Sequence, residues 1–195
     1  MSFLSEPETT AEAQRLFDED IAELGFVMNA SRLWAYQPDT LAALFGVLRQ
    51  SIAEHKLTLR ERGIVITACT SAFGDSYCSL AWGSKLAEAA DADTAAAVLR
   101  GVDGELTTAE RAMADWARKV ARDPNRTTAA DVQQLRDAGI GDAQIFAITT
   151  LVALRLAFST VNDALGLRPD AALRTTAPQV VLDAVTVGRP IEDGT

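Results

Sequence analysis

Apolar side chains recur along most of this chain at helical spacing, and the alternating patterns of strands are almost absent. Capping residues and glycines divide the pattern into segments joined by short links. The predicted helices span about residues 11–24, 40–52, 59–72, 76–89, 95–99, 108–120, 129–137 and 142–165. The pattern therefore predicts an all-α protein, folded as a compact bundle of about eight helices.

Two predicted helix boundaries lie in the middle of the chain. Thr58 and Glu61 have the spacing of a capping box, in which a hydroxyl and a carboxylate satisfy backbone N–H groups. The apolar run at 64–66 is therefore interpreted as buried helix rather than strand. Gly74 is expected to end that helix, and Asp75 is placed to cap the next one.

Residues 167–195 have a different character, with three prolines and one short apolar stretch at 180–185. Two interpretations stay open for this tail. It is an extension that packs across its own domain, or an arm that docks on a neighbouring subunit. No segment has the composition of a linker, so residues 1–195 are predicted to form a single domain that includes this extension.

The composition limits the partners and the location. The chain has 195 residues, of which 48% are hydrophobic, and a formal charge of −9 from 27 acidic and 18 basic residues. This charge disfavours nucleic acids and anionic membrane surfaces, because both attract basic proteins. No apolar run reaches the roughly 20 uncharged residues that cross a bilayer, and residues 1–6 lack the basic start of a secretory signal. We expect a cytoplasmic protein without nucleic-acid or membrane partners.

The chain has two cysteines, Cys69 and Cys78, and one histidine, His55. Two cysteines do not form a disulfide scaffold, and in a reducing cytosol they are expected to stay thiols. A single histidine excludes multi-histidine metal sites, and no haem or flavin motif is present, so no metal or cofactor is expected. His55 stands at a predicted helix end, where an imidazolium interacts favourably with the helix dipole, and we assign it no role.

The segment at residues 57–83, LTLRERGIVITACTSAFGDSYCSLAWG, resembles the core of the alkylhydroperoxidase D group of the carboxymuconolactone decarboxylase family. In that group a helix containing LxxxERE leads through a loop to C-x-Y-C-x-x-x-H on the next helix. Four later segments are similar to the peroxidase-related branch of the family, at residues 105–111, 116–119, 131–139 and 164–166. The resemblance covers roughly residues 15–190. It implies an alkylhydroperoxidase D-like helical fold, no cofactor, and a homo-oligomer such as a dimer, trimer or hexamer.

The resemblance also implies a redox mechanism. In the family, a thiolate at a helix N-terminus attacks a peroxide, and a second thiol three residues away resolves the sulfenic acid as a disulfide. A glutamate and a histidine relay protons. Matched position by position, the first cysteine falls on Asp75 and the second on Cys78, with Tyr77 between them. The histidine falls on Trp82 and the glutamate on Gly63, so two-cysteine turnover is expected to be lost.

Six residues around this altered motif form the candidate site. The candidate catalytic residues are Cys78, as a remaining nucleophile, and Asp75, as a general base. The predicted ligand pocket consists of Tyr77, Trp82, Ser76 and Gly63. The alternatives stay open, with Cys78 as an inert buried side chain, Asp75 as a helix cap and Trp82 as a filler of the cavity.

Two further positions bear on the chemistry. Cys69 is expected in the core, and the sequence leaves open whether it approaches Cys78. In the last predicted helix, Ser159 and Thr160 occupy the positions where the peroxidase-related branch carries an Asn-Arg pair.

The sequence thus supports two hypotheses about function. The resemblance implies a divergent peroxidase-type oxidoreductase with an antioxidant role, whose two-cysteine mechanism is lost. The alternative is a non-redox pseudo-enzyme, or a lyase- or isomerase-like protein, that binds a small apolar or aromatic molecule in the inherited pocket. Whether the chain is an enzyme stays open at this point.

Overall fold

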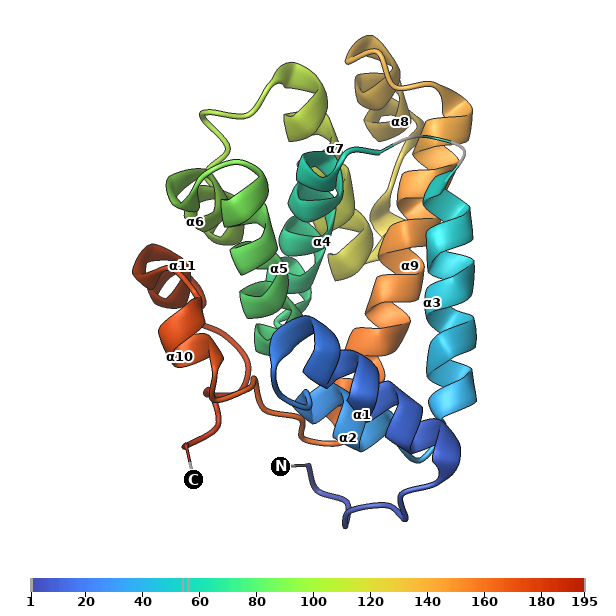
Figure 1. Cartoon of the computed structure of the whole chain (residues 1–195). Coiled ribbons are helices and arrows are strands. Elements are labelled where there is room, and N and C mark those ends of the chain that lie inside the picture. Colours follow the sequence, from blue (N-terminus) through green and yellow to red (C-terminus); the bar gives the residue numbers. More distant parts are fainter. Residues whose placement is uncertain (1, 54, 56, 195) are drawn as a thin grey trace.

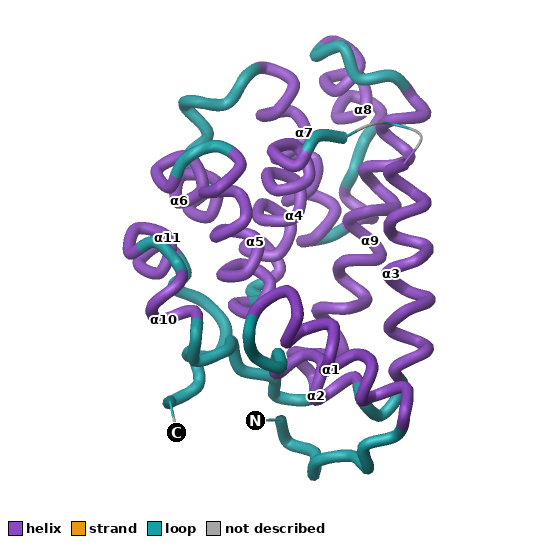
Figure 2. The backbone as a smooth tube through the Cα atoms, in the orientation of Figure 1, coloured by secondary structure: helices purple, strands orange, loops and turns teal. Residues whose placement is uncertain are grey.

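The computed structural model describes residues 2–53, 55 and 57–194. That part of the chain contains helices and no strand (Figure 2). Eight helices are long: α1 (Ala11–Leu24), α3 (Pro38–Ala53), α4 (Leu59–Phe73), α5 (Ser76–Ala89), α6 (Ala92–Arg100), α7 (Thr108–Arg122), α8 (Ala129–Asp137) and α9 (Asp142–Ala164). The short ones are α2 (Asn29–Trp34), α10 (Leu173–Thr176), α11 (Gln179–Ala184) and a 3-10 helix, η1 (Pro124–Arg126). The predicted fold class, an all-α bundle with eight principal helices, is confirmed.

Local chemistry explains the boundaries that position the site. The Thr58 hydroxyl accepts a 3.1 Å hydrogen bond from the N–H of Glu61, and the Glu61 carboxylate accepts one of 2.7 Å from the N–H of Thr58, so the predicted capping box is confirmed. Gly74 ends α4 with a φ of +91°, which glycine adopts without a steric cost. One predicted boundary is late. α3 begins at Pro38, ahead of Asp39, because the fixed φ of proline suits the first helical position.

The sequence pattern did not predict the three short α-helices, α2, α10 and α11. None of them exceeds six residues. An element of one or two turns repeats its apolar positions too few times to show a helical period.

Helix α4 forms the centre of the bundle. Its residues 63–70 are all buried, because α5, α6, α7 and α9 pack around it. α9 lies along α3, on the right of Figure 1, and also contacts α4 and α7. A large apolar core surrounds α4, and a second, smaller cluster joins residues of α2 and α3 to residues of α5 and α9. The buried members of that second cluster are Ala30, Leu33, Trp34, Leu41, Tyr77, Cys78, Phe158 and Leu167.

Helix α9 is the only helix in the described residues with the length and composition to span a membrane. It has 23 residues, and its most apolar window has a mean hydropathy of 1.6. The core helix of a globular protein passes the same test. In this structure 44% of that window is buried inside the bundle, against α3, α4 and α7.

The tail after α9 packs on its own chain. α11 lies against α6 and α5, on the left of Figure 1, and Val181 is fully buried in the core. Further along, the Ser76 hydroxyl donates a 2.7 Å hydrogen bond to the carbonyl of Arg189. In the described residues, the tail therefore covers the start of α5 within its own domain.

Candidate functional site

A cavity of about 840 Å³ lies between α1, α2, α3, α5, α9 and the beginning of the tail. Three aromatic side chains from different helices contribute to its wall, namely Phe45, Trp82 and Phe158. Tyr77 and Cys78 line the same cavity. The cavity therefore contains half of the six residues predicted for the site.

The start of α5 fixes the position of Cys78. The Asp75 carboxylate caps the helix by accepting a 3.0 Å hydrogen bond from the N–H of Cys78, as the sequence predicts. Cys78 is 2% exposed, and its Sγ accepts a 3.8 Å hydrogen bond from the hydroxyl of Ser159. Burial raises the pKa of the Cys78 thiol well above its usual value, and the nearby Asp75 raises this pKa further, while Arg155 acts in the opposite direction. The thiol is therefore protonated near neutral pH.

The second cysteine, Cys69, is not bonded to Cys78 in the structure. It lies on α4, is fully buried, and burial raises its pKa to about 12. Both cysteines are free thiols. Both cysteines are therefore buried thiols with raised pKa values in the structure.

Three of the predicted site residues lie outside the cavity. Asp75 is fully buried behind it, and its Oδ2 has no hydrogen-bond partner. Ser76 points toward the tail, where it bonds Arg189. Gly63 packs on α5, where an added Cβ would lie 3.1 Å from the Cδ1 of Leu86. These placements correct the expectation that Asp75, Ser76 and Gly63 share a pocket with Cys78.

Helical geometry explains this division. The α5 residues that line the cavity are Tyr77, Cys78, Ala81, Trp82, Ser84, Lys85 and Glu88, spaced so that they share one side of the helix. Ser76 stands immediately before this set and points to another side. Neighbours in a sequence motif separate in space when the motif lies on a helix.

The tail supplies a polar pair that the sequence did not reveal. The Tyr77 hydroxyl donates a 2.9 Å hydrogen bond to Oδ2 of Asp170, while Oδ1 of Asp170 accepts one of 2.6 Å from the N–H of Asn29. Asp170 lines the cavity and is 7% exposed. Burial raises the pKa of this carboxyl and also that of the Tyr77 phenol. No sequence motif predicts the role of Asp170, because it lies 93 residues from Tyr77 and contacts it only through tertiary packing.

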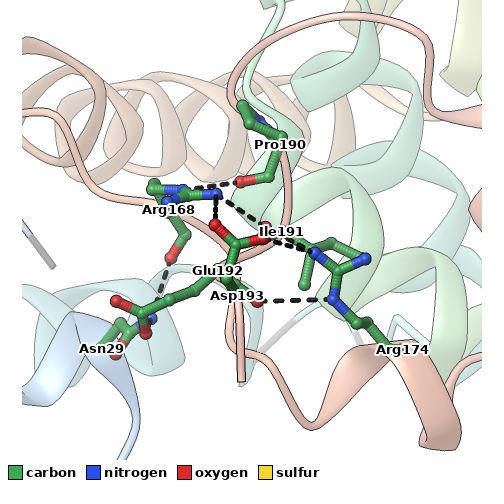
Figure 3. A network of polar contacts seen from close by, with 7 residues as sticks. All are labelled: Asn29, Arg168, Arg174, Pro190, Ile191, Glu192 and Asp193. Carbon is green, nitrogen blue, oxygen red and sulfur yellow. Dashed lines mark hydrogen bonds and ion pairs between the residues drawn. The ribbon is translucent and has the colours of Figure 1, made fainter. Parts of the chain in front are cut away.

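A network of polar contacts holds this part of the tail in place (Figure 3). Arg168 and Arg174 each donate a 2.9 Å hydrogen bond to the carbonyl of Ile191. The Asn29 side chain reaches from α2 to the Glu192 carboxylate at 2.8 Å and to the carbonyl of Arg168 at 3.1 Å. The network thus ties the C-terminal residues to the start of α2, next to Asp170.

A second residue missed by the sequence analysis is Arg155, in the middle of α9. It is 4% exposed and lines the cavity. Its guanidinium carbon lies 5.3 Å from the ring centre of Trp82, 5.4 Å from Phe45 and 5.6 Å from Phe158. The sequence does contain one indication of this residue. Arg155 is a single charged residue within the apolar stretch of α9 that begins at Ile145.

The other positions considered in the sequence, Ser159, Thr160 and His55, are not part of the cavity wall. Ser159 is fully buried beside Cys78, whereas Thr160 is exposed and bonds the carbonyl of Leu156. His55 follows α3 and is not part of the cavity wall, while Lys56 lies outside the described residues. Among the residues that the structure describes, no group of three or more His, Cys, Asp or Glu side chains is placed to hold a metal ion.

Comparisons with known proteins place the fold. No protein-family model matches the chain, and no curated protein matches it. Among solved structures it is similar to the alkylhydroperoxidase AhpD core of an uncharacterised peroxidase-related protein from Ralstonia eutropha JMP134, with 24% identity over 95% of this chain and 97% of that one and a TM-score of 0.75. An uncharacterised peroxidase-related protein from Silicibacter sp. TM1040 has 23% identity over 89% and 94% of the two chains, with a TM-score of 0.80.

A third similar structure is that of the debrominase Bmp8 in complex with 2,3,4-tribromopyrrole, with 19% identity over 95% of this chain and 100% of that one and a TM-score of 0.75. At these identities the comparisons show the fold. The chain therefore has the alkylhydroperoxidase D-like fold that its sequence resembles.

Proposed function

We propose that this chain binds a small apolar or aromatic molecule in the cavity between α1, α3, α5 and α9, and that it does not reduce peroxides with a cysteine pair. One observation carries this proposal. Cys78, which occupies the position of a family redox cysteine, is a buried thiol in the wall of an aromatic-lined cavity and forms no disulfide in the structure.

The chemistry of the thiol argues against peroxide reduction. The attacking species is a thiolate, and burial together with the carboxylate of Asp75 raises the pKa of Cys78. Where the family mechanism places its proton-relay groups, this chain has Trp82 and Gly63, which carry no titrating side chain. The other cysteine, Cys69, is fully buried and its pKa is raised to about 12, so it is a poor source of the thiolate that would resolve a sulfenic acid at Cys78.

The cavity itself supports ligand binding. A volume of about 840 Å³ lies within the range of small-molecule sites, which are lined mainly by apolar and aromatic side chains with a few polar groups. In this cavity the polar groups include Arg155, Tyr77 and Asp170. Bmp8, which shares the fold, is described in complex with 2,3,4-tribromopyrrole, a small planar molecule of the kind this cavity suits.

The pair formed by Tyr77 and Asp170 favours one second candidate function, a lyase or isomerase reaction on the bound molecule. A buried carboxyl with a raised pKa, hydrogen-bonded to a phenol, provides a pair of groups that could donate and accept protons at the bound molecule. This pair replaces Asp75 as the candidate general base, because Asp75 is not in contact with the cavity.

We further propose that the protein is cytoplasmic and that it forms a homo-oligomer. Large apolar side chains on the surface support self-association, with Phe146 of α9 75% exposed and Val47 of α3 51% exposed. Covering these side chains with a second subunit would remove apolar surface from water, which favours association.

The binding proposal is tested with N-phenyl-1-naphthylamine, a neutral dye that fluoresces in apolar surroundings. The wild type is expected to enhance its fluorescence with saturation at micromolar dye. Ala81→Phe fills the cavity from α5 and should weaken binding at least tenfold, whereas Ala89→Phe, another half-buried position of α5 outside the cavity wall, should change it less than threefold. Equal binding by both variants, or no binding by the wild type, would overturn the proposal. So would hydroperoxide consumption that depends on Cys78.

A further inference from the structure

Arg155 is a buried cation without a counterion. In the part of the chain that the structure describes, its guanidinium makes no hydrogen bond or ion pair, and its Nε is shielded from solvent without a partner. Arg118 is similarly buried, at 6% exposed against 4%, and its Nε also lacks a partner, but its terminal nitrogens pair with Asp103 and donate a 3.0 Å hydrogen bond to the carbonyl of Val98. An unpaired buried charge is costly to keep. The contrast indicates that the donors of Arg155 are reserved for a molecule other than the chain itself.

Three aromatic rings surround Arg155 but give its N–H groups no hydrogen-bond acceptor. The rings of Phe45, Trp82 and Phe158 attract the guanidinium from 5.3 to 5.6 Å. Phe158 is itself stacked on Trp34, with ring centres 5.6 Å apart, so its ring is fixed before any ligand arrives. Aromatic faces attract a cation but cannot accept its directed N–H bonds as oxygen atoms do. The rings therefore hold the guanidinium of Arg155 in place, while its N–H groups still lack an oxygen acceptor.

The remaining charges around the cavity limit the ligand. Acidic side chains in the wall outnumber basic ones, and most of them are exposed residues of α1, α3 and the end of α5, which we call the rim. The acidic residues are Glu12, Glu19, Glu23, Asp39, Glu88 and Asp170, and the basic ones are Arg15, Arg49, Lys85 and Arg155. Such a rim repels molecules with several negative charges. A ligand with a single anionic group suits both the rim and the interior.

We infer that Arg155 is the recognition group for a carboxylate, and that the ligand of this cavity is a small aromatic monocarboxylate. This inference rests on the proposed binding function and names its ligand class. The planar guanidinium matches a carboxylate through two parallel N–H bonds, and the low dielectric of the ring-lined cavity strengthens them. The aromatic body of the acid packs among the same three rings that hold Arg155.

The test compares two ligands of nearly equal shape, 2-naphthoate and its neutral analogue 2-naphthamide, by isothermal titration calorimetry. The wild type is expected to bind the acid at least tenfold more tightly than the amide. Arg155→Met should abolish this preference while its affinity for the amide stays within threefold of the wild type. Arg155→Lys, which keeps the charge but not the planar fork, should keep part of the preference. Arg32→Met removes an exposed cation of α2 outside the cavity wall and should leave the preference within threefold of the wild type.

The outcomes separate this inference from the function on which it rests. Equal binding of acid and amide by the wild type would overturn the assignment of a carboxylate ligand, and binding of the amide would leave the proposed function standing. A preference that survives in Arg155→Met, or that is lost equally in Arg32→Met, would overturn the role of Arg155. If the wild type binds neither naphthalene compound nor the neutral dye, both proposals fail. The comparison of acid and amide binding uses the wild type alone. It therefore tests the carboxylate ligand even if Arg155→Met fails to fold.

Discussion

Replacing Gly188 by alanine tests how closely the tail is docked on the start of α5. Gly188 has a φ of +76°, and an added Cβ would lie 2.7 Å from the carbonyl oxygen of Gly74 and 2.7 Å from the N of Ser76. A left-handed conformation costs a residue with a side chain about 1 kcal/mol, and a steric conflict in a packed region adds about 1–3 kcal/mol. Both obstructing atoms belong to the backbone, so a rotamer change gives no relief. We expect a loss of about 2–4 kcal/mol in the free energy of unfolding.

A matched control separates the contact from the conformation. Gly25 has nearly the same φ, +82°, but nothing lies within 4 Å of an added Cβ. Gly25→Ala should therefore lose only about 1 kcal/mol. Urea unfolding followed by circular dichroism measures both losses, and limited proteolysis should show earlier cleavage of the tail in Gly188→Ala alone. Equal losses and equal cleavage in the two variants would refute the close docking of the tail.

Three other predictions follow from buried groups. Cys69 and Cys78 should not react with Ellman's reagent in the native protein at pH 8, since burial raises the pKa of both thiols, and both should react in guanidinium chloride; rapid labelling of one native thiol would contradict their burial. Burial, together with the charge of Asp75, raises the pKa of Asp163 to about 7 in the folded chain from an ordinary value of 3.8. Because the native state alone then keeps the proton between those values, unfolding free energy should fall as the pH rises from 4 to 7. Asp163→Asn should remove this fall and be more stable than the wild type at pH 8. Urea titrations of both proteins at pH 4, 6 and 8 measure this difference. Unfolding free energies of the two proteins that change in parallel with pH would contradict it. Gly63→Ala should lower the unfolding free energy by up to about 2 kcal/mol, because overpacking against α5 costs about 1–3 kcal/mol and the higher helix propensity of alanine offsets about 1 kcal/mol. A raised denaturation midpoint would disprove that close packing.

The fold was predictable because its signals are local. The capping box at Thr58 and the glycine at Gly74 each satisfy backbone groups within a few residues. The cap of α5 by Asp75 is equally local, because it joins two residues only three positions apart. Eight long helices follow from such boundaries and from the apolar period between them.

The site was predicted only where it follows the motif. Tyr77, Cys78 and Trp82 do share a cavity, because their spacing places them on one side of α5. Arg155 and Asp170 come from α9 and the tail, and only the packing of the bundle brings them there. A motif on one helix cannot specify which side chains of other elements face it. The polar groups that matter most to the proposed function therefore required the structure.

A crystal structure of the wild type with 2-naphthoate would test the central claim most directly. The account predicts the naphthalene rings among Phe45, Trp82 and Phe158, the carboxylate within hydrogen-bond distance of the Arg155 guanidinium, and Cys78 as an unmodified thiol. A ligand bound outside this cavity, a carboxylate directed away from Arg155, or a covalent bond or oxidation at the Cys78 sulfur would contradict it.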